Sequence, residues 1–148
     1  MNQDQILLIA QQRAIQNHLP YAGALTPQEA FELSQINSQA VLVDVRSRAE
    51  LELVGRVPSA LHIEWAFYPG MVINDHFADQ LQERLDEDLI VMFLCRTAGR
   101  SHHAAAFAKQ LGFNKAYNVL EGFEGASNEL NQRTLINGWK HAGLPWTN

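Results

Sequence analysis

The segment IVMFLCRTAGRSHHAAAFAKQLG, Ile90 to Gly112, decides the fold of this chain because its pattern changes abruptly at Cys95, the only cysteine. A continuous apolar run precedes the cysteine. The run is too short for a typical helix and predicts a buried strand. A polar turn follows, and then an alanine-rich stretch with apolar residues at helical spacing, which Gly112 would close as a C-cap. The segment thus predicts a strand, a loop that begins at Cys95, and a helix over 101–112.

Similar patterns alternate along the rest of the chain. Apolar, β-branched runs predict further strands from 40 to about Asp44, over 59–65 and over 115–120. Helical spacing predicts further helices over 3–17, 26–37, 74–85 and 134–143. Thr26 would cap the second of these, and Asn74 or Asp75 the third. Because the strands are apolar on both faces, we expect an α/β fold with a mainly parallel sheet of about five strands, covered by helices on both sides.

The composition indicates one globular domain and excludes several classes of protein. Of 148 residues, 47% are apolar and 18% charged, and the net charge of −5 argues against a nucleic acid as the main partner. A single cysteine forms no intramolecular disulfide, and no Cys/His cluster has zinc-site spacing, so we expect neither metal nor cofactor. The N-terminus has neither the charged start of a signal peptide nor an apolar stretch that could span a membrane, which favours a reducing, cytoplasmic location.

The residues around Cys95 favour a reactive thiol. Ligand sites in parallel sheets lie beyond the carboxyl ends of the strands, where Cys95 is placed. A loop that curls into the start of a helix points successive backbone N–H groups inward and forms an anion-binding nest. This nest, the helix dipole and the charges of Arg96 and Arg100 favour the thiolate. A lone cysteine in an apolar strand is usually a small buried hydrophobic residue, but this setting favours a nucleophile.

The loop CRTAGRS, residues 95–101, resembles the active-site loop of the rhodanese family of sulfurtransferases. Four other segments resemble family elements in the same order along the chain: VLVDVRSRAE (41–50), GRVPSALHIEW (55–65), LGFNKAYNVLEGFEG (111–125) and NGWKHAGLPW (137–146). The resemblance implies a rhodanese-like three-layer sandwich. It implies one domain over 1–148, with a core over about 26–146 and an N-terminal helical extension.

The resemblance also implies a reaction. The Cys95 thiolate would take the outer sulfur of a small donor, thiosulfate or a persulfide, and pass it from a Cys95 persulfide to a thiol or a partner protein. The backbone N–H groups of the loop would bind the donor and the persulfide; these belong to Arg96, Thr97, Ala98, Gly99 and Arg100. We expect Asp44, Arg46 and Ser101 to support the loop. Asp44, Arg46 and Glu50 would form either an ion-pair network beneath it or a solvated charged turn.

The sequence departs from the family pattern within the loop and leaves two alternatives. Family loops often read Cys-Arg-Ser-Gly-x-Arg-Ser, whereas Ala98 and Gly99 fill the third and fourth places after this cysteine. One alternative is a cysteine phosphatase, but its pattern is Cys-x5-Arg, and the shorter spacing here suits a sulfur atom better than a phosphate. The other is a module that only binds partners, which loss of the cysteine would mark. We expect His102 and His103 to be exposed at the helix start and not to form a dyad with the cysteine.

Overall fold

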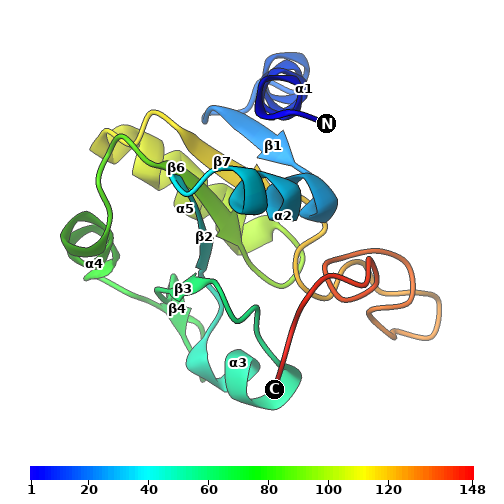
Figure 1. The fold of residues 1–148 in the computed structure, drawn as a ribbon. Coiled ribbons are helices and arrows are strands. Elements are labelled where there is room, and N and C mark those ends of the chain that lie inside the picture. Colours follow the sequence, from blue (N-terminus) through cyan, green and yellow to red (C-terminus); the bar gives the residue numbers. More distant parts are fainter.

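Five strands form a parallel sheet at the centre of the computed structural model, which describes residues 1–148 (Figure 1). In spatial order they are β1 (Gly23–Leu25), β7 (Ala116–Val119), β6 (Ile90–Leu94), β2 (Ala40–Asp44) and β3 (Leu61–His62). The apolar strand β6 lies in the middle and is buried along its whole length, which explains why its sequence shows no alternation. The predicted α/β fold with a parallel sheet is confirmed.

Helices cover both faces of the sheet. Alternate residues of β6 point into two separate apolar clusters, as the period of a strand requires. Ile90, Met92 and Leu94 pack with α1 (Gln3–Gln16) and α2 (Pro27–Ile36). Val91 and Phe93 pack with α4 (Phe77–Arg84) and α5 (Gly99–Leu111). The remaining helix, α3 (Arg48–Val54), lies beyond the carboxyl end of the sheet in Figure 1.

The N-terminal helix α1 belongs to the core. Its start at Gln3 is fixed by a capping box between Asn2 and Gln5. Ile6 and Ala10 are fully buried in the same cluster as β6. The helix comes very close to β1, because an added Cβ atom at Gly23 would lie 2.7 Å from the carbonyl carbon of Ala10. A glycine is therefore needed where α1 crosses the edge strand.

Several elements differ from the sequence-based expectation. The predicted strand over 59–65 is reduced to β3. The helix expected from 74 begins at Phe77 with no side-chain cap, because Asn74 Oδ1 accepts from the N–H of His76, which precedes the helix. The helix predicted over 134–143 is wrong. Thr134 and Gly138 have φ of +77° and +105°, values that interrupt a right-handed helix. Strand β1, helix α3 and a small antiparallel hairpin were not predicted; the hairpin pairs β4 (Ala66–Phe67) with β5 (Val72–Ile73).

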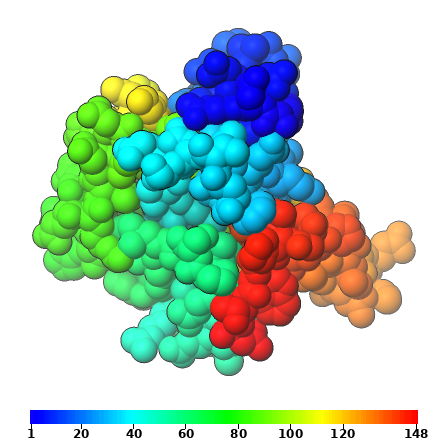
Figure 2. Space-filling view, in the orientation of Figure 1, coloured from blue at the N-terminus to red at the C-terminus, as the bar shows by residue number.

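The C-terminal segment closes over the side of the molecule. Trp139 is buried in the cluster that contains α1 and α2, and its indole N–H donates to the Pro145 carbonyl. Arg56 and Thr147 form an antiparallel bridge, and Figure 2 shows the C-terminal residues lying against the segment that follows α3. None of the helices has the length and apolar character needed to cross a membrane.

The close approach of α1 to β1 predicts a stability effect. Gly23→Ala should lower the free energy of unfolding by about 1–3 kcal/mol, because the new methyl group would overlap the backbone of Ala10. Urea denaturation measures the change. Gly99→Ala is the control, since an added Cβ atom there meets no atom within 4 Å. Equal stability of the two variants would contradict the proposed packing.

Candidate active site

Cys95 directly follows β6 and is 1% exposed. Its Sγ lies 3.3 Å from the Oγ of Ser101, which is in the first turn of α5. The side chain of Cys95 points to the face of the sheet that α4 and α5 cover. The sulfur is thus held beneath the loop, between the end of the central strand and the start of the helix.

The loop backbone makes a tight turn between Cys95 and α5. Ala98 is the N-cap and has a left-handed conformation with φ of +80°, whereas Gly99 is already helical. None of the backbone N–H groups from Arg96 to Ser101 donates a hydrogen bond to another part of the chain. Consecutive free N–H groups at a helix start form a region of positive potential suited to an anion.

A second stretch of backbone holds this loop from below. The carbonyls of Cys95 and Arg96 accept hydrogen bonds from the N–H groups of Phe123 and Glu124. An added Cβ atom at Gly122 would lie 2.3 Å from the Arg96 carbonyl oxygen, so only glycine allows the two backbones to approach this closely. The loop carbonyls are therefore turned away from the side on which the N–H groups are free.

Both arginines of the loop are paired with carboxylates. Arg100 donates two hydrogen bonds of 2.7 Å to Glu50, and Arg96 lies 3.2 Å from Glu124. Burial alone would raise the pKa of Glu50, but hydrogen bonds from Arg100 and from the Ser47 backbone, with the Arg100 charge, lower it to about 2. The hydrogen bond to Glu50 in turn raises the pKa of Arg100. The two arginines are held in place but carry less free charge than the sequence suggested.

A cavity of about 480 Å³ opens beside the loop, next to Arg96 and Arg100. Both arginine pairs contribute to its wall, and the tip of the β4–β5 hairpin forms another part. The lining residues are Ser47, Glu50, Val54, Tyr68, Gly70, Met71, Arg96, Arg100 and Glu124. The cavity is large enough for a small anion and for the side chain of an incoming thiol.

Asp44 and Arg46 form a buried ion pair at the carboxyl end of β2. Arg46 donates to both carboxylate oxygens of Asp44 and to the Gly55 carbonyl. Its guanidinium stacks 4.1 Å from the centroid of the Phe123 ring. The pair therefore ties the end of β2 to the segment that supports the loop. Glu50 pairs with Arg100 instead of joining this pair, so the structure contains neither the three-residue network nor the solvated charged turn.

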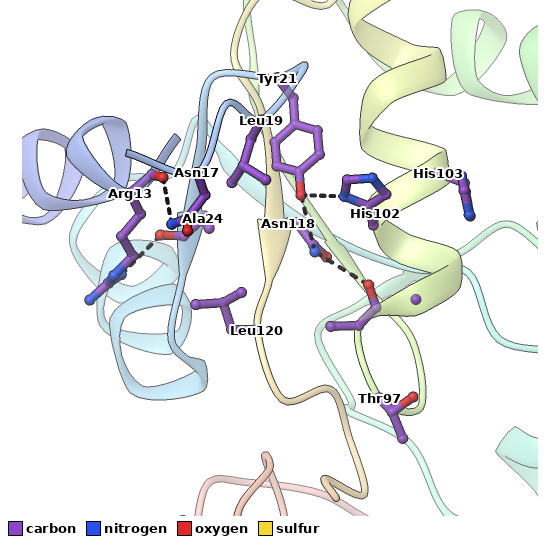
Figure 3. A pocket seen from close by; sticks show the side chains of 12 residues that line it. Arg13, Asn17, Leu19, Tyr21, Ala24, Thr97, His102, His103, Asn118 and Leu120 are labelled. Carbon is purple, nitrogen blue, oxygen red and sulfur yellow. Dashed lines mark hydrogen bonds between the residues drawn. The ribbon is translucent and has the colours of Figure 1, made fainter. Parts of the chain in front are cut away.

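Besides the sulfur, Ser101 contacts a polar cluster that was not predicted from the sequence. Ser101 donates to the Asn118 Oδ1 at 2.5 Å, and Asn118 Nδ2 lies 3.4 Å from the Tyr21 hydroxyl. The Tyr21 hydroxyl lies 2.7 Å from His102 Nδ1, as Figure 3 shows. His102 is thus half-buried, which corrects its expected exposure, whereas His103 is exposed. Asn118 could have indicated this cluster in the sequence, because it is a polar residue within the apolar run AYNV.

A second cavity, of about 620 Å³, lies on this side of the loop (Figure 3). The start of α5, the end of α1 and strand β7 surround it. Tyr21, His102 and Asn118 contribute to its wall together with Arg13, Asn17, Leu19, Ala24, Thr97, Ala98, Gly99, His103 and Leu120. Burial raises the pKa of Tyr21, although the hydrogen bond from Asn118 opposes this, so the phenol stays protonated near neutral pH. The loop that follows Cys95 is therefore flanked by two cavities.

The fold and the loop together define a parallel α/β protein that places one thiol under free N–H groups at a helix start. The chain matches the sequence profile of the Rhodanese-like domain over residues 26–129, and it belongs to that family. It is 31% identical over 121 residues to the thiosulfate sulfurtransferase GlpE of Actinobacillus succinogenes, covering 82% of this chain and 86% of that protein. It is 32% identical over 120 residues to protein RP600 of Rickettsia prowazekii, covering 80% and 91%.

Solved structures agree with this family. The crystal structure of Rv0390 from M. tuberculosis has a TM-score of 0.79 and 41% identity, covering 86% of this chain and 98% of that one. The solution structure of the polysulfide-sulfur transferase homodimer from Wolinella succinogenes has a TM-score of 0.58 and 24% identity, covering 84% and 77%. The second comparison supports the fold alone, and the first supports both fold and family.

The Glu50–Arg100 pair predicts how stability changes in acid. Since the pKa of Glu50 is about 2 in the folded protein against an ordinary 4.5, its ionised form stabilises the fold above about pH 4.5. This stabilisation is lost as the pH falls from 4.5 towards 2. In Glu50→Gln the side chain no longer titrates, so stability should fall less between about pH 6 and about pH 3 than in wild type. Urea denaturation at both pH values measures this.

Glu52→Gln is the matched control for that experiment. Glu52 lies on the same helix and pairs with Arg48, but both side chains are more than half exposed. Exposed pairs contribute little, so this variant should keep the wild-type pH dependence. The role of Glu50 would be contradicted if both variants and wild type lost stability equally in acid.

The left-handed conformation of Ala98 predicts a stabilising substitution. A residue with a Cβ atom in this conformation costs about 1–2 kcal/mol, and the greater freedom of unfolded glycine offsets about 0.5–1 kcal/mol of the gain from removing it. Ala98→Gly should therefore raise the free energy of unfolding by about 0.5–1 kcal/mol in urea denaturation. A clear loss of stability would show that the methyl group of Ala98 makes contacts that outweigh its backbone strain.

Proposed function

We propose that this protein is a sulfurtransferase that carries a sulfane sulfur on Cys95. The donor is a small molecule with a transferable outer sulfur, thiosulfate or a persulfide, and the acceptor is a thiol, free or on a partner protein. The observation that carries the proposal is the position of the Cys95 sulfur at the start of α5, where the N–H groups from Arg96 to Ser101 have no partner within the chain. The likeness to a protein named as a thiosulfate sulfurtransferase supports it.

In the first step the Cys95 thiolate attacks the outer sulfur of thiosulfate. A new bond forms between Sγ and that sulfur, and the bond within the donor breaks with its electron pair leaving on sulfite. The product is a Cys95 persulfide anion, so charge and atoms balance. Free N–H groups of the loop stabilise both the incoming anion and the persulfide, because preorganised donors need no rearrangement when charge arrives.

In the second step a thiolate acceptor attacks the outer sulfur of the persulfide. The bond to Sγ breaks and its electron pair returns to Cys95, which regenerates the thiolate. No base or metal is needed in either step when both thiols react as thiolates. The cavity beside Arg96 and Arg100 gives an acceptor a route to the loop.

Arg96 and Arg100 act mainly by holding the loop in shape, since Glu124 and Glu50 take up much of their charge. Asp44 and Arg46 hold the end of β2 beside it. The pairing of Arg100 also favours sulfur transfer over phosphatase chemistry, because a phosphoryl group requires a free guanidinium for two-point binding. The short Cys-x4-Arg spacing favours the same choice.

We further propose that residues 1–148 work as one domain, because one apolar cluster joins Ile6 near the N-terminus to Trp139 near the C-terminus. The reaction requires a reduced thiol, which the cytoplasm maintains.

Mass spectrometry tests the proposal directly, because Cys95 is the only thiol. After incubation with thiosulfate, the peptide that contains Cys95 should gain one sulfur atom, and a small thiol should remove it. Cys95→Ser should gain none and should lose sulfur transfer to cyanide, whereas His103→Ala should behave as wild type. Absence of the gain in a folded wild-type protein would overturn the proposal, and Cys95-dependent hydrolysis of p-nitrophenyl phosphate would point to the phosphatase.

A further inference from the structure

The hydrogen bonds beside Cys95 have a direction that the residue types fix. Asn118 Nδ2 lies 3.3 Å from the carbonyl oxygen of Ala98, which can only accept a hydrogen bond. The NH₂ group of Asn118 must therefore face Ala98, and its Oδ1 must face Ser101. The same orientation lets Nδ2 donate to the Tyr21 hydroxyl, which then donates to His102 Nδ1 (Figure 3).

This orientation means that the Ser101 hydroxyl donates its one proton to Asn118. Asn118 Oδ1 is an acceptor, so the 2.5 Å contact between it and Ser101 Oγ requires Ser101 to donate. Ser101 Oγ then has only lone pairs left to offer Cys95 Sγ, at 3.3 Å. A thiol can donate its S–H to those lone pairs. A thiolate cannot, and it would face an oxygen of the same partial charge.

We infer that Asn118 is a positioning residue that keeps Cys95 in its thiol form by holding the Ser101 proton away from the sulfur. The Ser101 hydroxyl would stabilise a thiolate only by turning towards Sγ, which leaves Asn118 Oδ1 without a donor. Both Ser101 and Asn118 are buried, so water does not readily replace the lost hydrogen bond. Asn118 thus opposes the free N–H groups of the loop, which favour the thiolate.

The charged groups around the sulfur do not replace this interaction. Arg100, which faces Cys95 from α5, is paired with Glu50 from α3. Arg46 is paired with Asp44 at the end of β2. On the side of β7, the only titratable groups in the cluster are Tyr21 and His102, which bond to each other. Ser101 is therefore the polar side chain that contacts the sulfur, and Asn118 decides where its proton lies.

The inference rests on Cys95 as the nucleophile of the proposed function, but its test does not require sulfur transfer. The pH dependence of iodoacetamide alkylation reports the thiolate of Cys95 alone, because the chain has no other cysteine. Asn118→Leu removes the acceptor and frees the Ser101 proton for the sulfur. The midpoint of the pH profile should move to lower pH by about 1 unit, which is roughly a tenfold faster reaction below the midpoint.

Asn118→Asp is the matched control, because it has the same shape and keeps an acceptor for Ser101 in either protonation state. Its midpoint should stay or move to higher pH. Tyr21→Phe leaves the contacts of Asn118 with Ala98 and Ser101 in place, so its midpoint should stay near that of wild type. A general disturbance of the site would shift the Leu and Asp variants in the same direction.

The route through Ser101 is tested by combining substitutions. In the Ser101→Ala background, Asn118→Leu should no longer shift the midpoint. Ser101→Ala alone should not move the midpoint to higher pH, since the resting hydroxyl does not donate to the sulfur; this prediction holds even if the Leu variant does not fold. A higher midpoint in Ser101→Ala, or a shift by Asn118→Leu that persists without Ser101, would overturn the inference. An alkylation result as predicted without persulfide formation would leave the inference standing and remove the proposed function.

Discussion

The hydrogen-bond ladders on both edges of β6 are the constraint on which the site depends. β2 and β7 run parallel to β6 on either side, in a register that pairs Leu94 with Asp44 and Phe93 with Asn118. Parallel strands bring their carboxyl ends to one edge of a sheet, so this register places the buried ion pair, the cysteine and the polar cluster side by side. Cys95 cannot move far from either group without breaking the central ladders.

The local signals in the sequence predicted most of the central fold. The strands at 40–44, 90–94 and 116–119 were visible as apolar runs, and α2 and α5 were visible from their capping residues and spacing. The missed elements lacked such signals. β1 is three residues long and is defined by its pairing with β7, which is remote in the chain. The helix wrongly predicted over 134–143 had suitable residue types, but Gly138 packs against the backbone of Gly125 in a conformation that a helix excludes.

The same distinction between local and remote signals applies to the site. Cys95 and its loop were predicted because a strand, a turn and a helix follow one another in one stretch. The partners of the loop could not be predicted, since Glu50 lies 50 residues before Arg100 and Tyr21 lies 97 residues before Asn118. These partners change the electrostatics of the loop. Both arginines are paired with carboxylates, so the unpaired donors of the loop are its backbone N–H groups, and the side chain in contact with the sulfur is that of Ser101.

The order of strands in the sheet also affects how the chain reaches this structure. β1 pairs only with β7, so the first and the last strand along the chain are neighbours in the sheet. Such a sheet has a high contact order, which slows folding because a long loop must close before the pairing forms. During synthesis, α1 and β1 leave the ribosome before Ala116–Val119, so the edge strand waits for its partner. The pairing edge of β1 stays open throughout that interval, and an unpaired strand edge exposes this part of the nascent chain to aggregation.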